Sequence, residues 1–270
     1  MTTASGPRVP TALTIAGSDS GGGAGIQADL KTFAAFGVFG TSAITAVTAQ
    51  NTVGVAAFEA VAVELVTLQI ETVAGDIAVH ATKTGMLANA AVVEAVAATI
   101  RELDLPLVVV DPVMLAKSGD ALLDEDGVRT LKAELLPCAR IVTPNIPEAE
   151  ALSGIRILSP ADAREAARRI QGMGPSAVVI KGGHGTGELL VDLLLDGDTF
   201  TELTTARIHT RNTHGTGCTF ASAIAAGLAL GQALDQATAA AQAYVAGAIR
   251  HGLPIGQGHG PLNHFWQGKK

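Results

Sequence analysis

Hydrophobic positions along the chain follow two patterns that alternate from one end to the other. Short apolar runs such as 12–16 and 107–110 are typical of strands that are buried on both faces. Positions 26, 30, 33 and 34 instead follow the spacing of one face of a helix. This alternation predicts an α/β fold, with a mostly parallel sheet and helices on both of its faces. The expected strands span 12–16, 41–47, 55–63 (an edge strand or flap), 78–84, 107–110, 141–143, 177–180, 189–195 and 199–206.

Capping residues mark where the helices between these strands begin and end. Asn89 and Asp124 stand where N-caps belong, and Ser159 precedes Pro160 and Asp162 in the order of a helix start. A glycine at position 37 suits the residue just after a helix. The expected helices span 25–36, 64–74, 89–103, 124–136, a segment from 159, 217–230 and 235–251, and Asp196-Gly197 predicts a hairpin turn.

Composition narrows the class of protein. A chain of 270 residues, 48% hydrophobic and 16% charged, suits one domain over 1–270, with 1–10 as a flexible tail. A net charge of −7 and only 3% aromatic residues argue against nucleic acid and anionic membranes as partners. Cys138 and Cys218 form no CxxC pair. Because no run resembles a signal peptide or a membrane span, we expect a cytoplasmic protein.

Glycines between the first strand and the first helix form the first candidate site. Ligands of open α/β sheets bind beyond the carboxyl ends of the strands, and five glycines lie within 17–25. Gly23-x-Gly25-x-x-Ala28 formally fits a dinucleotide fingerprint, which would make the protein a nicotinamide-dependent oxidoreductase. The next strand, however, ends at 48–50 without the acidic residue that such a site needs. A flexible turn is the simpler alternative.

The segment Asn212-Thr213-His214-Gly215-Thr216-Gly217-Cys218 precedes an Ala-rich helix. Backbone N–H groups at a helix start form an anion-binding hole, and the alternative is a capped helix with a tight entry turn. A cysteine exposed at such a position is expected to have a lowered pKa.

Polar residues also follow three later strands. Lys181 precedes a glycine-rich run at 182–187 that includes Gly183, and a lysine there suits contact with phosphate. Asn145 and Glu148 could support Mg²⁺ through water, although their spacing alone favours a capping box. Asp111 is either a cap or a carboxylate beside the metal.

Taken together, these motifs resemble the hydroxymethylpyrimidine/phosphomethylpyrimidine kinases of thiamine biosynthesis, within the ribokinase-like superfamily. The resemblance covers about residues 10 to 265. It is carried by the segments 13–19, 22–32, 48–51, 83–87, 111–114, 143–145, 181–184 and 212–219. It implies a three-layer α/β/α fold with a small β flap, ATP and Mg²⁺ as cofactors, and a homodimer. The implied reaction is phosphorylation of 4-amino-5-hydroxymethyl-2-methylpyrimidine, first to its monophosphate and then to its diphosphate.

The resemblance also implies a role for each candidate residue. The Gly17 backbone, Asp29 and Gln50 would hold the pyrimidine, and Met86 would pack on its ring. A glutamine amide can pair with the donor and acceptor edge of an aminopyrimidine, as it does with adenine. The remaining roles are an anion hole at Gly215, Thr216, Gly217 and Cys218, phosphate contact by Lys181, metal support by Asn145, Glu148 and Asp111, and nucleotide contact by Gly183 and Thr213.

Two alternatives accompany this interpretation. Many sugar kinases of the superfamily carry an aspartate where this chain has Cys218, and some pyridoxal kinases share the cysteine. In those pyridoxal kinases a second cysteine often follows the Asp-Pro-Val-Met motif, and this chain has Ala116 at the matching place. Pyridoxal kinase is the closest alternative, and a non-catalytic binding protein on the same fold is the other.

Overall fold

The computed structural model describes residues 9–115, 119, 121–182 and 187–268. Most of the expected N-terminal tail lies outside these residues, as do Ala116 and Gly183. Within the described part, Pro10 already accepts a hydrogen bond from the backbone N–H of Phe39, directly before the first strand.

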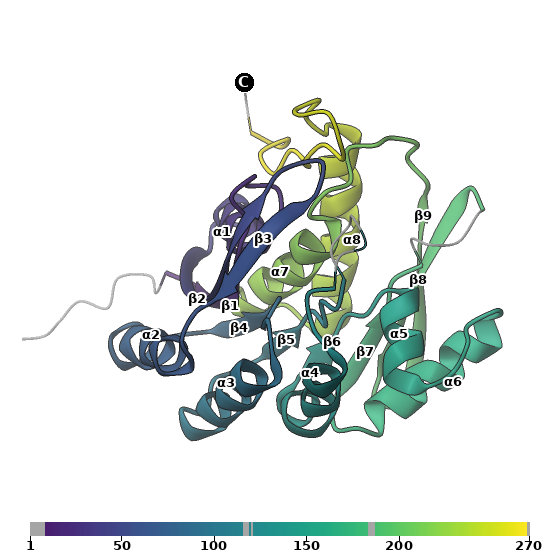
Figure 1. The fold of residues 1–270 in the computed structure, drawn as a ribbon. Coiled ribbons are helices and arrows are strands. Elements are labelled where there is room, and N and C mark those ends of the chain that lie inside the picture. Colours follow the sequence, from purple (N-terminus) through teal and green to yellow (C-terminus); the bar gives the residue numbers. More distant parts are fainter. Residues whose placement is uncertain (1–8, 116–118, 120, 183–186, 269–270) are drawn as a thin grey trace, which may run out of the picture.

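Nine strands form one sheet in the order β3-β2-β1-β4-β5-β6-β7-β8-β9 (Figure 1). The strands are β1 (Thr11–Ser18), β2 (Phe39–Gln50), β3 (Val55–Ala60), β4 (Ala81–Thr84), β5 (Val108–Val110), β6 (Ile141–Val142), β7 (Ala177–Ile180), β8 (Leu189–Asp196) and β9 (Thr199–Ala206). Strands β2, β1, β4, β5, β6 and β7 run parallel to one another. Strand β3 at one edge, and β8 and β9 at the other end of the sheet, pair antiparallel with their neighbours. The expected mostly parallel sheet is confirmed, and so is the hairpin at Asp196-Gly197.

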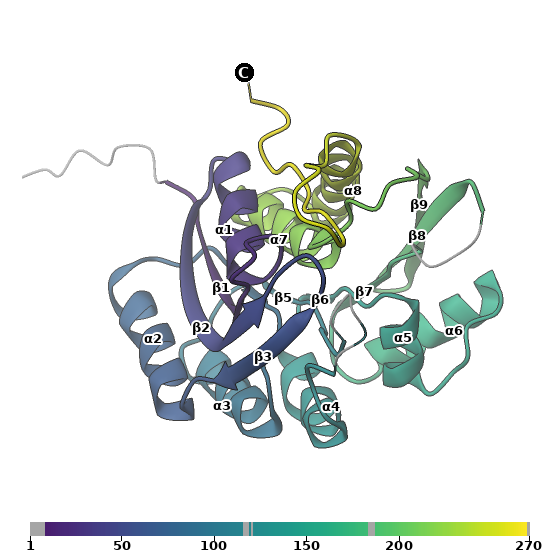
Figure 2. The ribbon, with the colours of Figure 1, turned by 45° about the horizontal axis from the view of Figure 1, so that its top comes forward.

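Helices cover both faces of the sheet. The helices are α1 (Gly25–Ala35), α2 (Val63–Asp76), α3 (Ala90–Glu102), α4 (Glu125–Thr130), α5 (Ile146–Ser153), α6 (Pro160–Gln171), α7 (Thr216–Ala229) and α8 (Leu234–Arg250). Helices α1, α7 and α8 lie on one face, and α2 to α6 lie on the other (Figures 1 and 2). The three-layer α/β/α arrangement is therefore confirmed.

Strand alternation divides the apolar core between the two faces. On β5, Val108 and Val110 pack toward α3, whereas Val109 packs toward α7 and α8. Since each strand here is covered on both sides, its residues are apolar in succession. This explains why short continuous runs marked the central strands in the sequence.

The order in which strands are added to the sheet changes direction at β1, and this change determines where the site lies. The chain moves from β1 outward to β2 and β3, and it then returns to β4 on the other side of β1. Such a switch point opens a crevice beyond the carboxyl ends of the strands. Strand β3 and the end of β2 form the antiparallel flap beside this crevice (Figure 2). Pairing with β3 also makes β2 longer than the expected 41–47.

Most helix boundaries agree with the capping residues. The side chains of Asn89, Asp124 and Ser159 accept hydrogen bonds from Val92, Gly127 and Asp162, respectively. The helix expected at 124–136 differs, because α4 ends at Thr130. The chain continues through a π turn at Leu131–Leu135 and a 3-10 turn at Leu136–Cys138. Pro137 has no N–H to donate, so a regular α-helix cannot continue through it.

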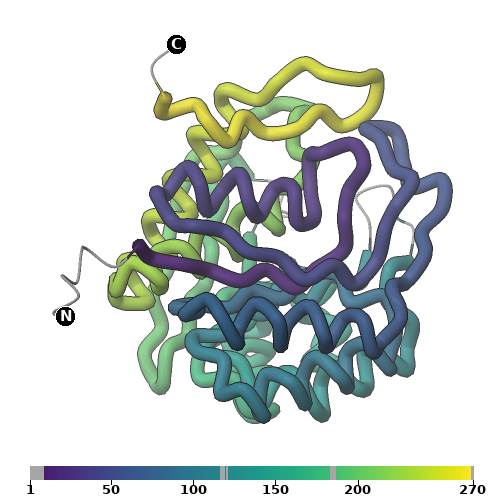
Figure 3. Tube along the Cα trace, turned by 90° about the vertical axis from the view of Figure 1, so that its left-hand side faces the viewer, coloured from purple at the N-terminus to yellow at the C-terminus, as the bar shows by residue number. Residues whose placement is uncertain are grey.

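The C-terminal segment after α8 packs beside the turn that follows β2 (Figure 3). The backbone N–H of His259 donates to the Thr52 carbonyl, and that of His214 donates to Gly260. This segment therefore holds the loop before α7 against the first half of the sheet. Among the described helices, none is both long and apolar enough to cross a membrane.

Candidate active site

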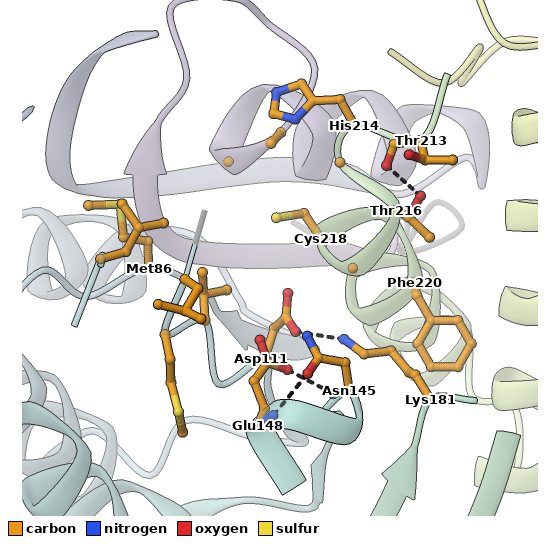
Figure 4. Close-up of a pocket in the computed structure, with 18 of the residues that line it drawn as sticks. Met86, Asp111, Asn145, Glu148, Lys181, Thr213, His214, Thr216, Cys218 and Phe220 are labelled. Atoms are coloured by element: carbon orange, nitrogen blue, oxygen red, sulfur yellow. Dashed lines mark hydrogen bonds and ion pairs between the residues drawn. The ribbon is translucent and has the colours of Figure 1, made fainter. Parts of the chain in front are cut away.

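A cavity of about 1000 Å³ opens at the carboxyl ends of the parallel strands. Its wall combines the loops after β1, β4, β5, β6 and β7 with the start of α7. Of the predicted site residues within the described part of the chain, all except Asp29 line this cavity. Figure 4 shows Cys218 at the start of α7, with Met86 on one side and Lys181 and Asp111 on another.

Gly17, Met86 and Gln50 form the wall predicted to hold the pyrimidine. A Cβ atom at Gly17 would lie 3.0 Å from the Met86 sulfur, so a side chain at position 17 would require Met86 to shift. The Gln50 side chain is partly exposed, and its Oε1 lies 3.3 Å from the Thr48 hydroxyl. These three residues come from β1, the loop after β4 and the end of β2, and the sheet brings them together as expected.

Asp29 lies beneath this cavity rather than on its wall, so its predicted contact with the pyrimidine stays a prediction. Its carboxylate is fully buried under the cavity and bonds to Lys83 at 2.8 Å. The hydroxyls of Thr14 and Ser222 each donate to it at 2.6 Å. With both oxygens engaged inside the protein, Asp29 joins α1, β1, β4 and α7.

The loop before α7 has the geometry of an anion-binding site. Gly215 is the N-cap with φ +85°, and a Cβ there would lie 1.8 Å from the Gly23 carbonyl oxygen. Only glycine fits a position that is both left-handed and this crowded. The backbone N–H groups of Gly217 and Cys218 donate to no acceptor within the described residues, so they remain available to an anion. Thr216 and Thr213 line the cavity beside them and hydrogen-bond at 2.8 Å.

The pKa of the Cys218 thiol is raised, whereas a lowered pKa is expected for an exposed cysteine at a helix start. Burial raises the pKa of its thiol to about 12. The charge of Lys83 opposes this rise, as does a hydrogen bond from the Gly25 N–H, while Asp29 and Asp111 reinforce it. Desolvation and the carboxylates therefore outweigh the helix start, and Cys218 carries a neutral thiol at pH 7.

Lys181 and Asp111 form an ion pair at the ends of β7 and β5. Their charged atoms are 3.1 Å apart, and the Thr143 hydroxyl lies 3.3 Å from the same Asp111 oxygen. Burial alone would lower the pKa of Lys181, but Asp111 and Glu148 raise it, so its ammonium stays charged. A Cβ at Gly217 would lie 3.4 Å from the Lys181 nitrogen. The lysine thus lies close to the anion-binding loop.

Asn145 and Glu148 form the capping box that their spacing favours. The Asn145 side chain accepts from the Glu148 N–H at 2.9 Å, and Glu148 Oε2 accepts from the Asn145 N–H at 2.8 Å. Burial raises the pKa of Glu148 to about 7, with Asp111 adding to the rise and Lys181 opposing it.

The same residues also fit a hydrated Mg²⁺ ion. Oε1 of Glu148 and Oδ2 of Asp111 take no hydrogen bond within the described residues, and both side chains line the cavity. The described residues hold no group of three or more acidic, histidine or cysteine side chains that could bind a metal directly. Mg²⁺ keeps much of its hydration shell and binds through few carboxylates together with phosphates, which agrees with this set.

Two buried polar pairs at the site were not predicted from the sequence. Nε2 of His214 lies 2.9 Å from Oδ2 of Asp19, and both side chains are buried. Lys83 is fully buried at the end of β4, where it lines the cavity and pairs with Asp29. Two signals in the sequence point to these pairs. One is a histidine inside the anion-hole motif, and the other is a lysine among the buried residues of a short strand.

A second region of the cavity lies between the β8–β9 hairpin and α8. It is lined mainly by apolar side chains and small polar groups, namely Leu190, Thr205, Ile208, Gln242, Val245, Ala246 and Ile249. An apolar slot that opens onto a lysine and an anion-binding loop suits a nucleotide, with its base in the slot.

Solved structures define the class of protein. A Bacillus subtilis pyridoxal kinase in complex with ADP superimposes with a TM-score of 0.90 at 40% identity, covering 96% of this chain and 99% of that one. The phosphomethylpyrimidine kinase of Clostridium difficile 630 matches with a TM-score of 0.80 at 42% identity, over 90% of this chain and 100% of the other. The fold is therefore ribokinase-like, and the site at its switch point is that of a kinase.

Sequence comparison then gives the family. Residues 19–263 match the family described as phosphomethylpyrimidine kinase. The hydroxymethylpyrimidine/phosphomethylpyrimidine kinase of Bacillus subtilis is 52% identical over 255 residues, or 94% of each chain. The thiamine biosynthesis bifunctional protein ThiED of Geobacter sulfurreducens is 52% identical over 253 residues, but the chain spans only 52% of its length. The chain belongs to the phosphomethylpyrimidine kinase family. The expected kinase is confirmed, and neither an oxidoreductase nor a non-catalytic protein agrees with this membership.

Proposed function

We propose that the protein uses ATP and Mg²⁺ to phosphorylate 4-amino-5-hydroxymethyl-2-methylpyrimidine, and then phosphorylates the resulting monophosphate to the diphosphate. The observation that carries this proposal is the single cavity that joins the Gly17–Gln50–Met86 wall to the anion-binding loop and Lys181. A substrate on that wall has its hydroxymethyl group directed toward Cys218, where a phosphoryl group on the loop can meet it.

Each step balances as a phosphoryl transfer. In the first, the substrate hydroxyl oxygen forms a bond to the γ-phosphorus, the bond from that phosphorus to the bridging oxygen breaks, and ADP leaves. The hydroxyl proton goes to Cys218 in its thiolate form. A thiol of pKa about 12 is rarely a thiolate at pH 7. Because phosphoryl transfer depends mainly on positioning and charge stabilisation, this small thiolate fraction is enough to accept the proton.

In the second step the nucleophile is a phosphate oxygen of the monophosphate. A phosphate monoester is already largely ionised near neutral pH, since its second pKa is about 6. No base is then required. The N–H groups of Gly217 and Cys218 and the ammonium of Lys181 surround the transferred group in both steps. Asn145, Glu148 and Asp111 would hold Mg²⁺ through water, and the bound ion would supply charge neutralisation on the phosphates.

The proposal includes one kinase domain over 1–270, a cytoplasmic location, nucleotide contact by Thr213 and Gly183, and the homodimer that the family resemblance implies. Sedimentation equilibrium of the full chain tests the dimer.

Pyridoxal phosphorylation is the second candidate, because a pyridoxal kinase shares the fold at 40% identity over nearly the whole chain. ADP release, followed with the pyrimidine and with pyridoxal in parallel, separates the two. We expect the pyrimidine to give the higher kcat/KM. Turnover of pyridoxal alone would overturn the proposed function.

A further inference from the structure

Lys83 is a buried charged group beside the phosphoryl-transfer site that has no role in the two proposed steps. Its side chain is 0% exposed, yet it lines the same cavity as Cys218. An ammonium group has three donors. Asp29 is the one hydrogen-bond acceptor that the described residues provide for it. A buried ammonium group with unused donors beside a reaction site can stabilise negative charge that develops there.

The geometry of α7 places this cation beside Cys218. Ser222 follows Cys218 by four residues, so the two side chains lie on the same face of the helix. The Ser222 hydroxyl donates to Asp29 Oδ1 at 2.6 Å, and Lys83 donates to Asp29 Oδ2 at 2.8 Å. The Lys83–Asp29 pair is therefore anchored one helical turn below Cys218, on the face that carries the thiol.

The anchor holds the lysine rigidly. The Thr14 hydroxyl also donates to Asp29 Oδ2, at 2.6 Å. The carboxylate of Asp29, on α1, is therefore held by side chains of β1 and α7, and it in turn holds Lys83 on β4. A Cβ at Gly85 would lie 2.6 Å from the Lys83 nitrogen, which shows how closely the following turn surrounds the ammonium. Burial alone would lower the pKa of Lys83, but the charges of Asp29 and Asp111 raise it, so the group stays protonated.

We propose that Lys83 is a positioning residue of the proposed kinase reaction: its ammonium, anchored on Asp29, is the fixed positive charge that stabilises negative charge on the Cys218 sulfur. Four groups act on the charge of that sulfur, namely Lys83 on β4, Asp29 on α1, Asp111 after β5 and the N–H of Gly25 at the start of α1. Of these, Lys83, Asp111 and Gly25 line the cavity together with Cys218, and Asp29 lies beneath it. Two of them are carboxylates that oppose a thiolate. Lys83 is the cation among the four.

The rate at which Cys218 reacts with iodoacetamide tests this assignment without requiring any kinase activity. Cys138 is the only other cysteine, so a Cys138→Ser background leaves a single thiol to follow. Below the thiol pKa, the alkylation rate at fixed pH is proportional to the thiolate fraction. We expect Lys83→Met to slow alkylation at pH 8.5 at least about tenfold, which corresponds to one pKa unit.

Asp29→Asn provides the matched control, because it keeps the shape of the side chain and removes the opposing charge. It should accelerate alkylation. The double variant Lys83→Met/Asp29→Asn removes both charges, leaves no unpaired buried ion, and should react at nearly the rate of the parent. General loosening of the site would expose the thiol and accelerate all three variants. Alkylation of Lys83→Met at or above the parental rate, in protein that retains its thermal melting transition, would overturn the proposal.

The inference rests on the proposed function only in its kinetic consequence. Single-turnover rates of Lys83→Met should fall about tenfold in the first phosphorylation and change less than about twofold in the second. If the parent protein phosphorylates no pyrimidine, the proposed function fails, whereas the alkylation rates still decide whether Lys83 stabilises the thiolate. If the parent is active and the alkylation rates do not move, only the role of Lys83 fails.

Discussion

The imidazole of His214 lies 2.9 Å from the carboxylate of Asp19 and joins two glycine-rich loops that are 195 residues apart. Asp19 also accepts the N–H groups of Gly21, Gly23 and Ala24, so one carboxylate organises the loop after β1. His214 directly precedes the anion-binding turn. The pair thus fixes the substrate wall relative to the phosphoryl site.

Asp19→Asn tests this link through stability. Burial would raise the pKa of Asp19, but the hydrogen bond from His214 and those from Ala24 and Gly21 outweigh it, and the pKa is lowered. A depressed carboxyl pKa stabilises the fold above the unfolded value of about 3.9 and loses that contribution as the pH falls through the folded value. We expect Asp19→Asn to cost about 2 kcal/mol at pH 7. Urea denaturation from pH 8 to 3 should show a difference between parent and variant that shrinks below pH 4. A difference that is independent of pH would contradict this account.

Gly215→Ala should abolish the anion-binding geometry while leaving the fold in place. The new Cβ would meet the Gly23 carbonyl oxygen at a left-handed backbone position. Since displacement of a positioning group by about 1 Å can cost 100-fold, kcat/KM should fall at least that much. Gly231→Ala is the matched control, because Gly231 has φ +79° with nothing within 4 Å of its Cβ position. It should cost about 1 kcal/mol of stability and leave kcat/KM unchanged. Equal kinetic losses in the two variants would argue against a specific role for Gly215.

Cys218→Ala should separate the two phosphorylations. The first step transfers a proton from a hydroxyl, whereas the monophosphate is already ionised. We expect the single-turnover rate of the first step to fall at least about 100-fold, and that of the second less than about tenfold. Rapid-quench measurements with each substrate decide this. Equal losses in both steps would show that Cys218 serves only the geometry of the loop.

Glu148 should make Mg²⁺ dependence sensitive to pH. Its pKa is raised to about 7, mainly by burial. Because a metal-supporting carboxylate must be deprotonated, the Mg²⁺ concentration for half-maximal rate should rise as the pH falls from 8 to 6. Glu148→Gln should need more Mg²⁺ at pH 8 and lose this pH dependence. An unchanged pH profile in that variant would place the titration elsewhere.

Much of the site could be predicted from the sequence, because its chemistry lies in loops next to regular strands. The capping box at Asn145 and the glycine turn at 215 are local, so a few neighbouring residues determine them. The family resemblance supplied the roles of Gly17 and Gln50, and the rule that ligands meet the carboxyl ends of strands agrees with where they lie.

The pairs Asp29–Lys83 and Asp19–His214 could not be predicted in this way, since the tertiary fold alone brings such distant residues together. Position 29 lies on the same helix face as Ile26 and Phe33, and a charged residue among apolar positions is a signal from which its burial could be expected. Its pairing with Lys83 could not be expected, because nothing local in 81–84 identifies the carboxylate that Lys83 contacts. Asp29 therefore supports the site from beneath, and its predicted contact with the pyrimidine stays a prediction.

Phosphorus NMR of the products tests the central claim most directly. The protein is incubated with ATP, Mg²⁺ and 4-amino-5-hydroxymethyl-2-methylpyrimidine, and a parallel sample receives pyridoxal. The account predicts a monophosphate signal that is replaced by the paired signals of a pyrimidine diphosphate, with ADP formed at two equivalents for each pyrimidine. A reaction that phosphorylates pyridoxal and leaves the pyrimidine unchanged would contradict it.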